Sequence, residues 1–488
     1  MAHDWSDVLA DLEARTRAAR AMGGAERIGR QAGRGRLNAR ERIGRLCDTG
    51  TFAEVGLLVG SAHPGGGAAV PADALVGGTA LVDGRPVVVL AEDFTVQGGS
   101  IGHGTHAKRV RLAQLATRER LPLLLLLDGA GERATNALER YAYAPNDLQV
   151  IADLVGQVPV VTLVLGVSAG HGALSGVFAD LIIMAEGSSM FTAGPPLVEA
   201  ALGLQVEPDA LGGAVMHTAE SGVAHNLATS EDEAFAMARR FLSFLPTNDA
   251  EPTPHATVDV AARSLDDILD VIPRNVRRSY DMGEVLTRLA DGGAYFEVQP
   301  SYGTSLVTAF AHLGGQAVLI VANQPRVMGG AITREAAEKA SHFLGVAGAF
   351  GLPVVFLADN PGVMVGPDAE RAGTLRAAAR MYQMQRALPG PKLHVTIRKA
   401  FGFGSSLMAM NPFDHQTVTL AFPGISLGGV PAFGGARAAG ASPEDASSLA
   451  QSQDGAWVPA DNGSYDRVID PRDLRTELIR ALGTTAHR

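Results

Sequence analysis

The chain repeats itself at one fixed offset, and this repeat limits its possible folds. The segment Val87–Ile101 (VVVLAEDFTVQGGSI) matches Val318–Ile332 (VLIVANQPRVMGGAI), which places Gly98-Gly99 on Gly329-Gly330, 231 residues later. Further pairs at this offset are Lys108 with Lys339, Asp128 with Asp359 and Gly131 with Gly362. A period above about 200 residues indicates a duplicated domain rather than a solenoid repeat. Two divergent copies of one unit therefore lie in the chain.

Each copy also contains a strand that leads into a Gly-x-Gly turn, with the offset slipped to 232 residues. These turns are Gly170-His171-Gly172 and Gly402-Phe403-Gly404. Such a turn can simply reverse the chain, or it can bind phosphate, but neither sequence matches a nucleotide-binding fingerprint. A third interpretation is an oxyanion hole, in which backbone N–H groups hold a developing negative oxygen. The occurrence of the turn at equivalent places favours two oxyanion sites, one for each reacting partner.

The alternation of apolar runs with helical patterns predicts an α/β fold with helices packed over a mixed or parallel sheet. In the first copy we expect strands at 75–82, 86–92, 121–127 and 158–165, and helices at 105–119 and 145–154. In the second copy we expect strands at 317–321, 354–357 and 393–397, and helices at 334–349 and 369–386.

A proline-rich, acidic stretch at 246–266 reads as a linker between the copies. We therefore expect two domains, 1–250 with a helical arm at 1–50, and 251–488. The small, polar segment Ala432–Gly463 predicts no regular structure.

Composition excludes several classes of function. The net charge of −10 argues against a broad nucleic-acid-binding surface, and the single cysteine, Cys47, excludes a disulfide framework or a multi-cysteine zinc site. No histidine spacing typical of zinc is present, so we expect no metal. The longest apolar run, Leu121–Leu127, is too short to cross a membrane, and the charged N-terminus does not resemble a signal peptide. We expect a cytoplasmic protein that does not bind membranes.

Five arginines lie between Arg34 and Arg45 (RGRLNARERIGR). One interpretation is a solvated helix face. The other is an arm that packs on a partner subunit or contacts an anionic ligand.

Many long motifs, in the right order over most of the chain, resemble the carboxyltransferase (β) subunits of biotin-dependent acyl-CoA carboxylases, such as the propionyl-, methylcrotonyl- and acetyl-CoA enzymes. They include MGGAERIGRQAGRGRLNARERI (22–43), GRPVVVLAEDFTVQGGSIG (84–102), FTAGPPLVEAALG (191–203) and ANQPRVMGGAI (322–332). The resemblance implies two tandem crotonase-superfamily (ClpP/crotonase) domains of the β-β-α superhelix type, which agrees with the repeat. The arginine-rich segment falls within a family motif, which favours an arm near the phosphates of coenzyme A.

The resemblance also implies a reaction. Carboxybiotin, delivered on a separate carrier protein, supplies CO2 to the α-carbon of an acyl-CoA thioester through an enolate. Gly170 and His171 would face the acyl-CoA and Gly402 and Phe403 the biotin, although the opposite assignment stays open. Further implied substrate-binding residues are Gly98, Gly99, Gly172, Arg133, Gly404 and Ser406, with Gly329 and Gly330 on the biotin side. The implied partners are a biotin carboxylase, a biotin carboxyl carrier subunit and further copies of the chain, in a dimer or hexamer.

Three departures from the family pattern stand at these positions. His171 replaces a second glycine, the S-G-G-A-R stretch is altered around Arg133, and Ser406 takes an acidic position of the propionyl-type members. Two alternatives follow. One is a biotin-independent decarboxylase or hydrolase of a malonyl-type thioester, with His171 as the proton donor. The other is a non-catalytic scaffold subunit.

Overall fold

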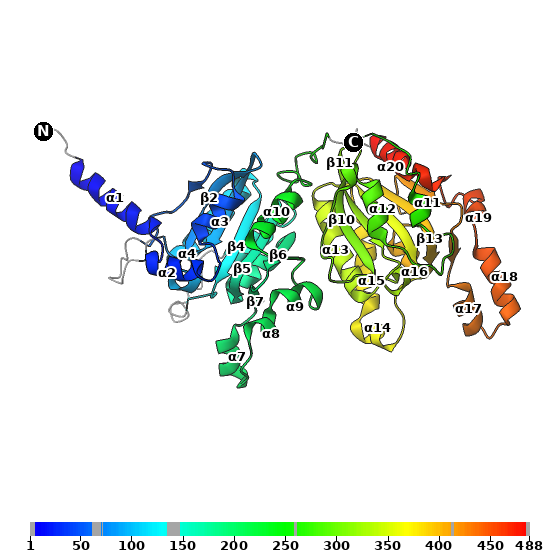
Figure 1. Cartoon of the computed structure of the whole chain (residues 1–488), viewed down its shortest axis with the longest axis horizontal. Coiled ribbons are helices and arrows are strands. Elements are labelled where there is room, and N and C mark those ends of the chain that lie inside the picture. Colours follow the sequence, from blue (N-terminus) through cyan, green and yellow to red (C-terminus); the bar gives the residue numbers. More distant parts are fainter. Residues whose placement is uncertain are drawn as a thin grey trace. The chain divides into compact units, whose positions relative to one another are not determined.

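Two units make up the chain (Figure 1). The computed structural model describes residues 5–60, 70, 72–133, 147–257, 261–410 and 414–484. The N-terminal unit extends to Leu242 and includes Thr247–Glu251, and the C-terminal unit comprises Ser243–Pro246 and the chain from Pro252. Each unit is built around its own mixed sheet of eight strands.

The N-terminal sheet has the strand order β1-β2-β3-β4-β5-β6-β8, with β7 paired to the end of β5. Its strands are β1 (Ala53–Glu54), β2 (Leu75–Val82), β3 (Arg85–Glu92), β4 (Leu123–Gly129), β5 (Val160–Ala169), β6 (Leu181–Ala185), β7 (Ser189–Phe191) and β8 (Asn226–Ala228). Strands β2 and β3 form an antiparallel hairpin, and β3 to β6 run parallel. Parallel strands are covered on both faces, which explains why every residue of β4 (LLLLLDG) is buried.

The C-terminal sheet repeats this topology in the order β16-β14-β13-β12-β11-β10-β9, with β15 paired to β13. Its strands are β9 (Tyr295–Glu297), β10 (Leu306–Leu313), β11 (Gln316–Asn323), β12 (Val354–Asn360), β13 (Lys392–Phe401), β14 (Val418–Ala421), β15 (Ser426–Gly428) and β16 (Arg467–Val468). Leu123 pairs with Val160, and Val354 pairs with Lys392. The slip from 231 to 232 residues therefore falls between β4 and β5 in one copy and between β12 and β13 in the other.

Helices surround each sheet. Those of the N-terminal unit are α1 (Ser6–Arg20), α2 (Ala25–Ala32), α3 (Ala39–Leu46), α4 (His103–Glu119), α5 (Asp147–Leu154), α6 (Gly170–Val177), α7 (Pro195–Leu202), α8 (Pro208–Gly212), α9 (Ala214–Ala219) and α10 (Glu231–Leu242). Those of the C-terminal unit are α11 (Ile268–Val271), α12 (Met282–Leu289), α13 (Arg334–Ala349), α14 (Pro367–Ala372), α15 (Thr374–Arg386), α16 (Gly402–Leu407), α17 (Ala432–Ala438), α18 (Pro443–Gln453), α19 (Trp457–Asp461) and α20 (Leu474–Gly483).

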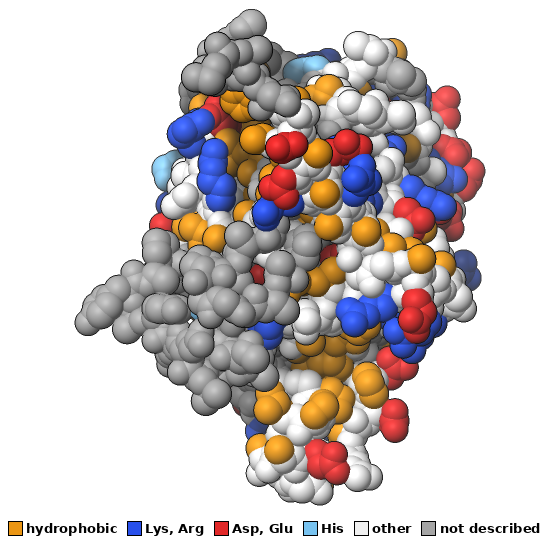
Figure 2. Space-filling model, turned by 90° about the vertical axis from the view of Figure 1, so that its left-hand side faces the viewer, with side chains coloured by type: hydrophobic (Ala, Val, Ile, Leu, Met, Phe, Trp, Pro, Cys, Tyr) orange, Lys and Arg blue, Asp and Glu red, His pale blue; other side chains and the backbone are white. Residues whose placement is uncertain are grey.

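Helix α7 projects from the N-terminal unit and exposes apolar side chains. Leu197 is 63% exposed and Leu202 is 68% exposed, and no residue of α7 is buried. Figure 2 shows hydrophobic side chains gathered at the lower edge of the view, and Figure 1 shows α7 at the lower edge of the N-terminal unit. Elsewhere on the same face, acidic and basic side chains are interspersed. Helix α7 therefore presents an apolar surface to solvent.

Two expectations about helices are wrong. The segment Ala432–Gly463 contains α17, α18 and α19. Helix α18 begins with a capping box, in which the Ser442 hydroxyl accepts from the Asp445 N–H at 3.1 Å and the Asp445 carboxylate accepts from the Ser442 N–H at 3.1 Å. The helix expected at 369–386 is interrupted at Gly373, whose φ of +80° separates α14 from α15. The first two residues of the helix expected at 145–154 lie outside the described residues.

Candidate active site

The glycine loops of the N-terminal unit meet at the carboxyl ends of its parallel strands. Gly99 follows β3 with φ +68°, and a Cβ there would lie 2.3 Å from the carbonyl oxygen of Asp128 on β4. A Cβ on Gly131 would lie 2.6 Å from the carbonyl oxygen of Ala169, at the end of β5. These contacts require glycine, because any larger residue would push the loops apart. Ligands of α/β folds bind at this edge of the sheet.

The turn after β5 is shaped to present N–H groups. Ala169 is extended, Gly170 has φ +54°, and α6 begins at that glycine. The first N–H groups of a helix have no acceptor within the helix, so those of Gly170, His171 and Gly172 are the donors that this turn can offer. The turn can therefore hold a negatively charged oxygen.

The turn after β13 has the same backbone. Phe401 is extended and Gly402 has φ +57°. A Cβ on Gly402 would lie 3.0 Å from the carbonyl oxygen of Gly429, and one on Gly404 would lie 2.6 Å from the side-chain oxygen of Asn360. The two turns therefore have equivalent backbones in equivalent places.

An apolar pocket of about 260 Å³ lies beside the Gly402 turn. Two residues singled out in the sequence, Phe403 and Ser406, both line it, and Phe403 is exposed. The remaining lining residues are Leu375, Ala378, Ala379, Tyr382 and Leu407. The structure thus brings together the turn, the aromatic residue and the serine on the C-terminal side.

A buried polar cluster lies behind the Gly170 turn, and the sequence did not reveal it. The Nε2 atom of His171 is 2.5 Å from one carboxylate oxygen of Asp147, on α5. The other oxygen of Asp147 accepts from Arg109 Nε at 2.6 Å. Arg109 also donates to Glu92 at 3.1 Å and to the Ser175 hydroxyl at 2.6 Å. Neither Asp147 nor Arg109 has any solvent-exposed surface.

The acids of this cluster differ in their pKa values. Burial raises the pKa of Glu92 to about 7, against the opposing charge of Arg109. Burial also raises the pKa of Asp147, but the charge of Arg109 and the hydrogen bond with His171 outweigh it, and the pKa lies below its usual value. Asp147 is therefore a carboxylate at neutral pH.

Glu92 is the one member of the cluster that the repeat could have indicated. At the offset of 231 it falls on Asn323. Each side chain accepts a hydrogen bond from the next-to-last residue of the neighbouring strand: Glu92 from the Asp128 N–H of β4 at 2.9 Å, and Asn323 from the Asp359 N–H of β12 at 3.0 Å. Arg109 and Asp147 are far apart in the sequence and belong to no recognisable motif. Only the packing of α4 and α5 brings them to His171.

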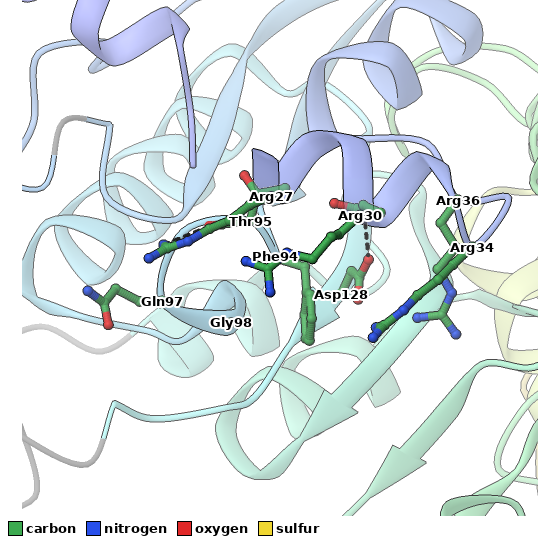
Figure 3. A pocket seen from close by; sticks show the side chains of 10 residues that line it. Arg27, Arg30, Arg34, Arg36, Phe94, Thr95, Gln97, Gly98 and Asp128 are labelled. Atoms are coloured by element: carbon green, nitrogen blue, oxygen red, sulfur yellow. Dashed lines mark hydrogen bonds between the residues drawn. The ribbon is translucent and has the colours of Figure 1, made fainter. Parts of the chain in front are cut away.

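A second pocket, of about 390 Å³, lies in the N-terminal unit and carries positive charge (Figure 3). Four arginines line it: Arg27, Arg30, Arg34 and Arg36. The opposite wall is the loop after β3, with Phe94, Thr95, Gln97 and Gly98, and Asp128 closes it from β4. Figure 3 shows these side chains around one space. Such a pocket fits a phosphorylated or otherwise anionic ligand.

Arg42 neutralises the acid of this pocket. Its guanidinium donates to Asp128 at 2.8 Å and to Glu231 at 2.8 Å, and Arg42 itself is fully buried. The expectation of a solvated helix face is therefore wrong for Arg42. It holds for Arg45 on the same helix, whose side chain is 53% exposed in its pair with Asp232.

The other predicted residues have local partners. Arg133 donates to Asp73 at 2.6 Å and to the carbonyl oxygen of Ser100 at 3.0 Å, so its charge is already paired. Gly329 and Gly330 lie after β11, where Lys399 donates to the carbonyl oxygen of Gly329 at 3.0 Å.

Within the described ranges, no group of three or more His, Cys, Asp or Glu side chains is arranged to hold a metal ion. In the same part of the chain, none of the helices has the length and apolar character that a membrane crossing needs.

Comparison with known proteins decides the family. Residues 30–431 match the carboxyl transferase domain. The chain belongs to the carboxyl transferase family. One relative is the methylmalonyl-CoA decarboxylase subunit alpha of Veillonella parvula, which is 33% identical over 96% of this chain and 94% of the relative. The methylmalonyl-CoA carboxyltransferase 12S subunit of Propionibacterium freudenreichii subsp. shermanii is 34% identical over 95% of this chain and 91% of the relative.

A solved carboxyl transferase structure matches the whole chain. It is the transcarboxylase 12S hexamer with methylmalonyl-coenzyme A and methylmalonic acid bound, with a TM-score of 0.93 at 32% identity over 100% of this chain and 97% of that one. The fold is therefore that of two tandem crotonase-like domains, as the resemblance implied. Other relatives are named propionyl-CoA carboxylase beta chain and biotin-dependent long chain acyl-coenzyme A carboxylase beta4 subunit.

Proposed function

We propose that this carboxyltransferase moves CO2 from carboxybiotin to the α-carbon of an acyl-CoA thioester. The observation that carries the proposal is the equivalence of the turns at Gly170 and Gly402, with φ values of +54° and +57° at the ends of corresponding strands. A transfer between two carbonyl-containing reactants develops negative charge on an oxygen of each. Two similar N–H turns meet that need.

On the thioester side, the N–H groups of Gly170 and His171 hold the thioester oxygen as the α-carbon becomes an enolate. Gly172 leaves room behind the turn, since a Cβ there would lie only 3.2 Å from Glu92 Oε1. This assignment is supported by the arginine-lined pocket, which lies in the same unit as the Gly170 turn.

On the biotin side, the Gly402 turn fits the ureido group. That group has a neutral carbonyl oxygen, which suits N–H donors, on a ring with apolar edges, which suits the pocket formed by Phe403, Ala378 and Leu407. When bound, carboxybiotin supplies CO2 and then the base that accepts the α-proton. Phe403 and Ser406 limit the size and polarity of what enters beside the turn.

The arginine-lined pocket is proposed to hold the phosphates of coenzyme A. We expect the double substitution of Arg30 and Arg34 by glutamine to weaken coenzyme A binding roughly tenfold, because each exposed charge that is removed contributes ~1 kcal/mol or less to the binding free energy. Titration calorimetry at two salt concentrations measures this, and the loss should shrink at high salt. The matched control is Arg45→Gln, an exposed arginine of α3 that does not line the pocket. Equal affinity of the double variant and the control contradicts the assignment.

The relatives also suggest partners. We propose a biotin carboxylase and a biotinylated carrier protein as partners, because a beta subunit among the relatives is named biotin-dependent. We also propose a homo-oligomer, since the matching 12S structure is described as a hexamer and α7 exposes Leu197 and Leu202. The proposed domains, 1–250 and 251–488, would supply the thioester side and the biotin side respectively.

The experiment that tests the proposal is a panel assay. The purified chain is mixed with acetyl-, propionyl- and methylmalonyl-CoA, with and without a carboxylated biotin carrier, and carboxylated or decarboxylated thioesters are separated by chromatography. Carboxyl transfer that requires the carrier supports the proposal. Binding of thioesters without any carrier-dependent transfer overturns it.

A further inference from the structure

Three buried charged residues of the N-terminal unit have no task in the carboxyl transfer proposed above. Arg109, Asp147 and Glu92 form one connected cluster, and the cluster ends at the side chain of His171. His171 is also the residue whose backbone N–H is assigned to the thioester oxygen. A fully buried ion pair such as that of Arg109 with Asp147 is costly to bury, so its presence at this turn needs a reason.

The fold itself does not need this cluster, as the second copy shows. At the offset of 231, Arg109 corresponds to Ala340 and Asp147 to Ala378, and at 232 His171 corresponds to Phe403. The C-terminal unit has the same strand order and the same turn without these three side chains. At the corresponding place it has the apolar pocket lined by Ala378 and Phe403. The cluster is therefore specific to the thioester side.

The cluster fixes which nitrogen of His171 is free. One oxygen of Asp147 is held by Arg109 Nε at 2.6 Å, and the other lies 2.5 Å from His171 Nε2. Because Asp147 is ionised, it accepts the proton of Nε2, and a neutral ring then carries its lone pair on Nδ1. Nδ1 is the ring nitrogen nearer the main chain, and so nearer to whatever the His171 N–H binds. The side chain retains 14% exposure to solvent.

We propose that His171 is a proton acceptor and donor for the α-carbon of the thioester, positioned by Asp147, and that the N-terminal turn therefore has a proton-transfer activity that does not need biotin. This rests on the proposed function, because it requires the thioester at the Gly170 turn. In the forward step the Cα–H bond breaks, the electron pair moves onto the thioester oxygen held by the turn, and the proton goes to Nδ1. The imidazolium then lies against the Asp147 carboxylate, exchanges its proton with water and returns one to the α-carbon.

The test is hydrogen exchange. Wild-type protein is incubated with propionyl-CoA in D2O, without biotin, carrier or ATP, and loss of the α-proton signal is followed by NMR. We expect exchange above the rate in buffer. His171→Gly, which keeps the backbone N–H, should lower exchange about 100-fold or more, on the scale of a lost acid–base group, and should lower carrier-dependent carboxyl transfer by a smaller factor than exchange. Asp147→Asn, as a positioning variant, should lower the exchange rate about tenfold without changing the propionyl-CoA concentration at half-saturation.

The control is His106→Gln. The ring of His106 lies 6.3 Å from that of His171, so this variant removes a neighbouring imidazole and leaves the pair of His171 with Asp147. The control should exchange like the wild type, and equal loss in it overturns the proposal. Equal losses of exchange and of carboxyl transfer in His171→Gly also overturn it, because they indicate a structural role. A wild type that binds propionyl-CoA by calorimetry but does not exchange it overturns this proposal alone. Absence of binding to acetyl-, propionyl- and methylmalonyl-CoA alike overturns the proposed function as well.

Discussion

Replacing Gly402 by valine is expected to lower carboxyl transfer about 10²- to 10³-fold, the loss seen when an oxyanion donor is misplaced. Gly402 has φ +57°, which a β-branched residue adopts only under strain. A Cβ there would also lie 3.0 Å from the carbonyl oxygen of Gly429, a tight contact that adds to the strain of the backbone. Affinity for coenzyme A, measured by calorimetry, should stay at the wild-type value, since the proposed coenzyme pocket belongs to the N-terminal unit.

The matched control for this variant is Gly463→Val. Gly463 has φ +77°, and a Cβ there would meet nothing within 4 Å, so this variant carries the backbone strain alone. It should retain carboxyl transfer within a few-fold. Loss of coenzyme A binding in Gly402→Val would show that the two turns have the opposite ligands.

Replacing Arg42 by alanine is expected to destabilise the N-terminal unit by about 3–5 kcal/mol, the range found when one partner of a buried ion pair is removed. Arg42 is fully buried and donates to both Asp128 and Glu231. Its loss leaves Asp128 as an unpaired buried charge in the wall of the arginine-lined pocket. Coenzyme A affinity should therefore fall together with stability. The loss of stability is measured by urea unfolding followed by circular dichroism, with calorimetry to separate the transitions of the two units.

Arg45→Ala is the control for Arg42→Ala, because Arg45 lies on the same helix and pairs with Asp232 at the surface. An exposed pair of this kind contributes about 0–1 kcal/mol. If Arg42→Ala and Arg45→Ala unfold at the same urea concentration, the buried pair does not stabilise the unit.

The repeat predicted the duplicated sheets and the two turns, because both depend on local patterns. Glycines with positive φ and apolar strands depend on a few consecutive residues. The fixed offset then identified the equivalent residues in the other copy. The strand pairs Leu123–Val160 and Val354–Lys392 are equivalent in the two copies. The change of offset from 231 to 232 therefore lies in the segment that connects the two paired strands. The helices at 432–463 were missed because their small side chains hide the apolar periodicity, although Ser442 and Asp445 form a capping box visible in the sequence.

The charged cluster could not be predicted in the same way. Asp147 and His171 are 24 positions apart, and Arg42 and Asp128 are 86 apart. Such pairs form only when helices dock on a sheet, and a single sequence does not show which charged residues face inward. The sequence offered no general base for this reason. His171 appeared as a lone departure from a glycine, and the structure supplies the carboxylate that orients it.

The arginine-lined pocket is assembled from two stretches of chain, and this limits how the protein can be shortened. One wall comes from Arg27 to Arg36, ahead of the sheet, and the Gly23 N–H donates to the Thr95 hydroxyl of the other wall at 3.0 Å. A recombinant fragment that starts at β2 would keep the strands that carry the glycine turns and lose half of the pocket. An expression fragment meant to keep the pocket therefore has to begin before residue 23.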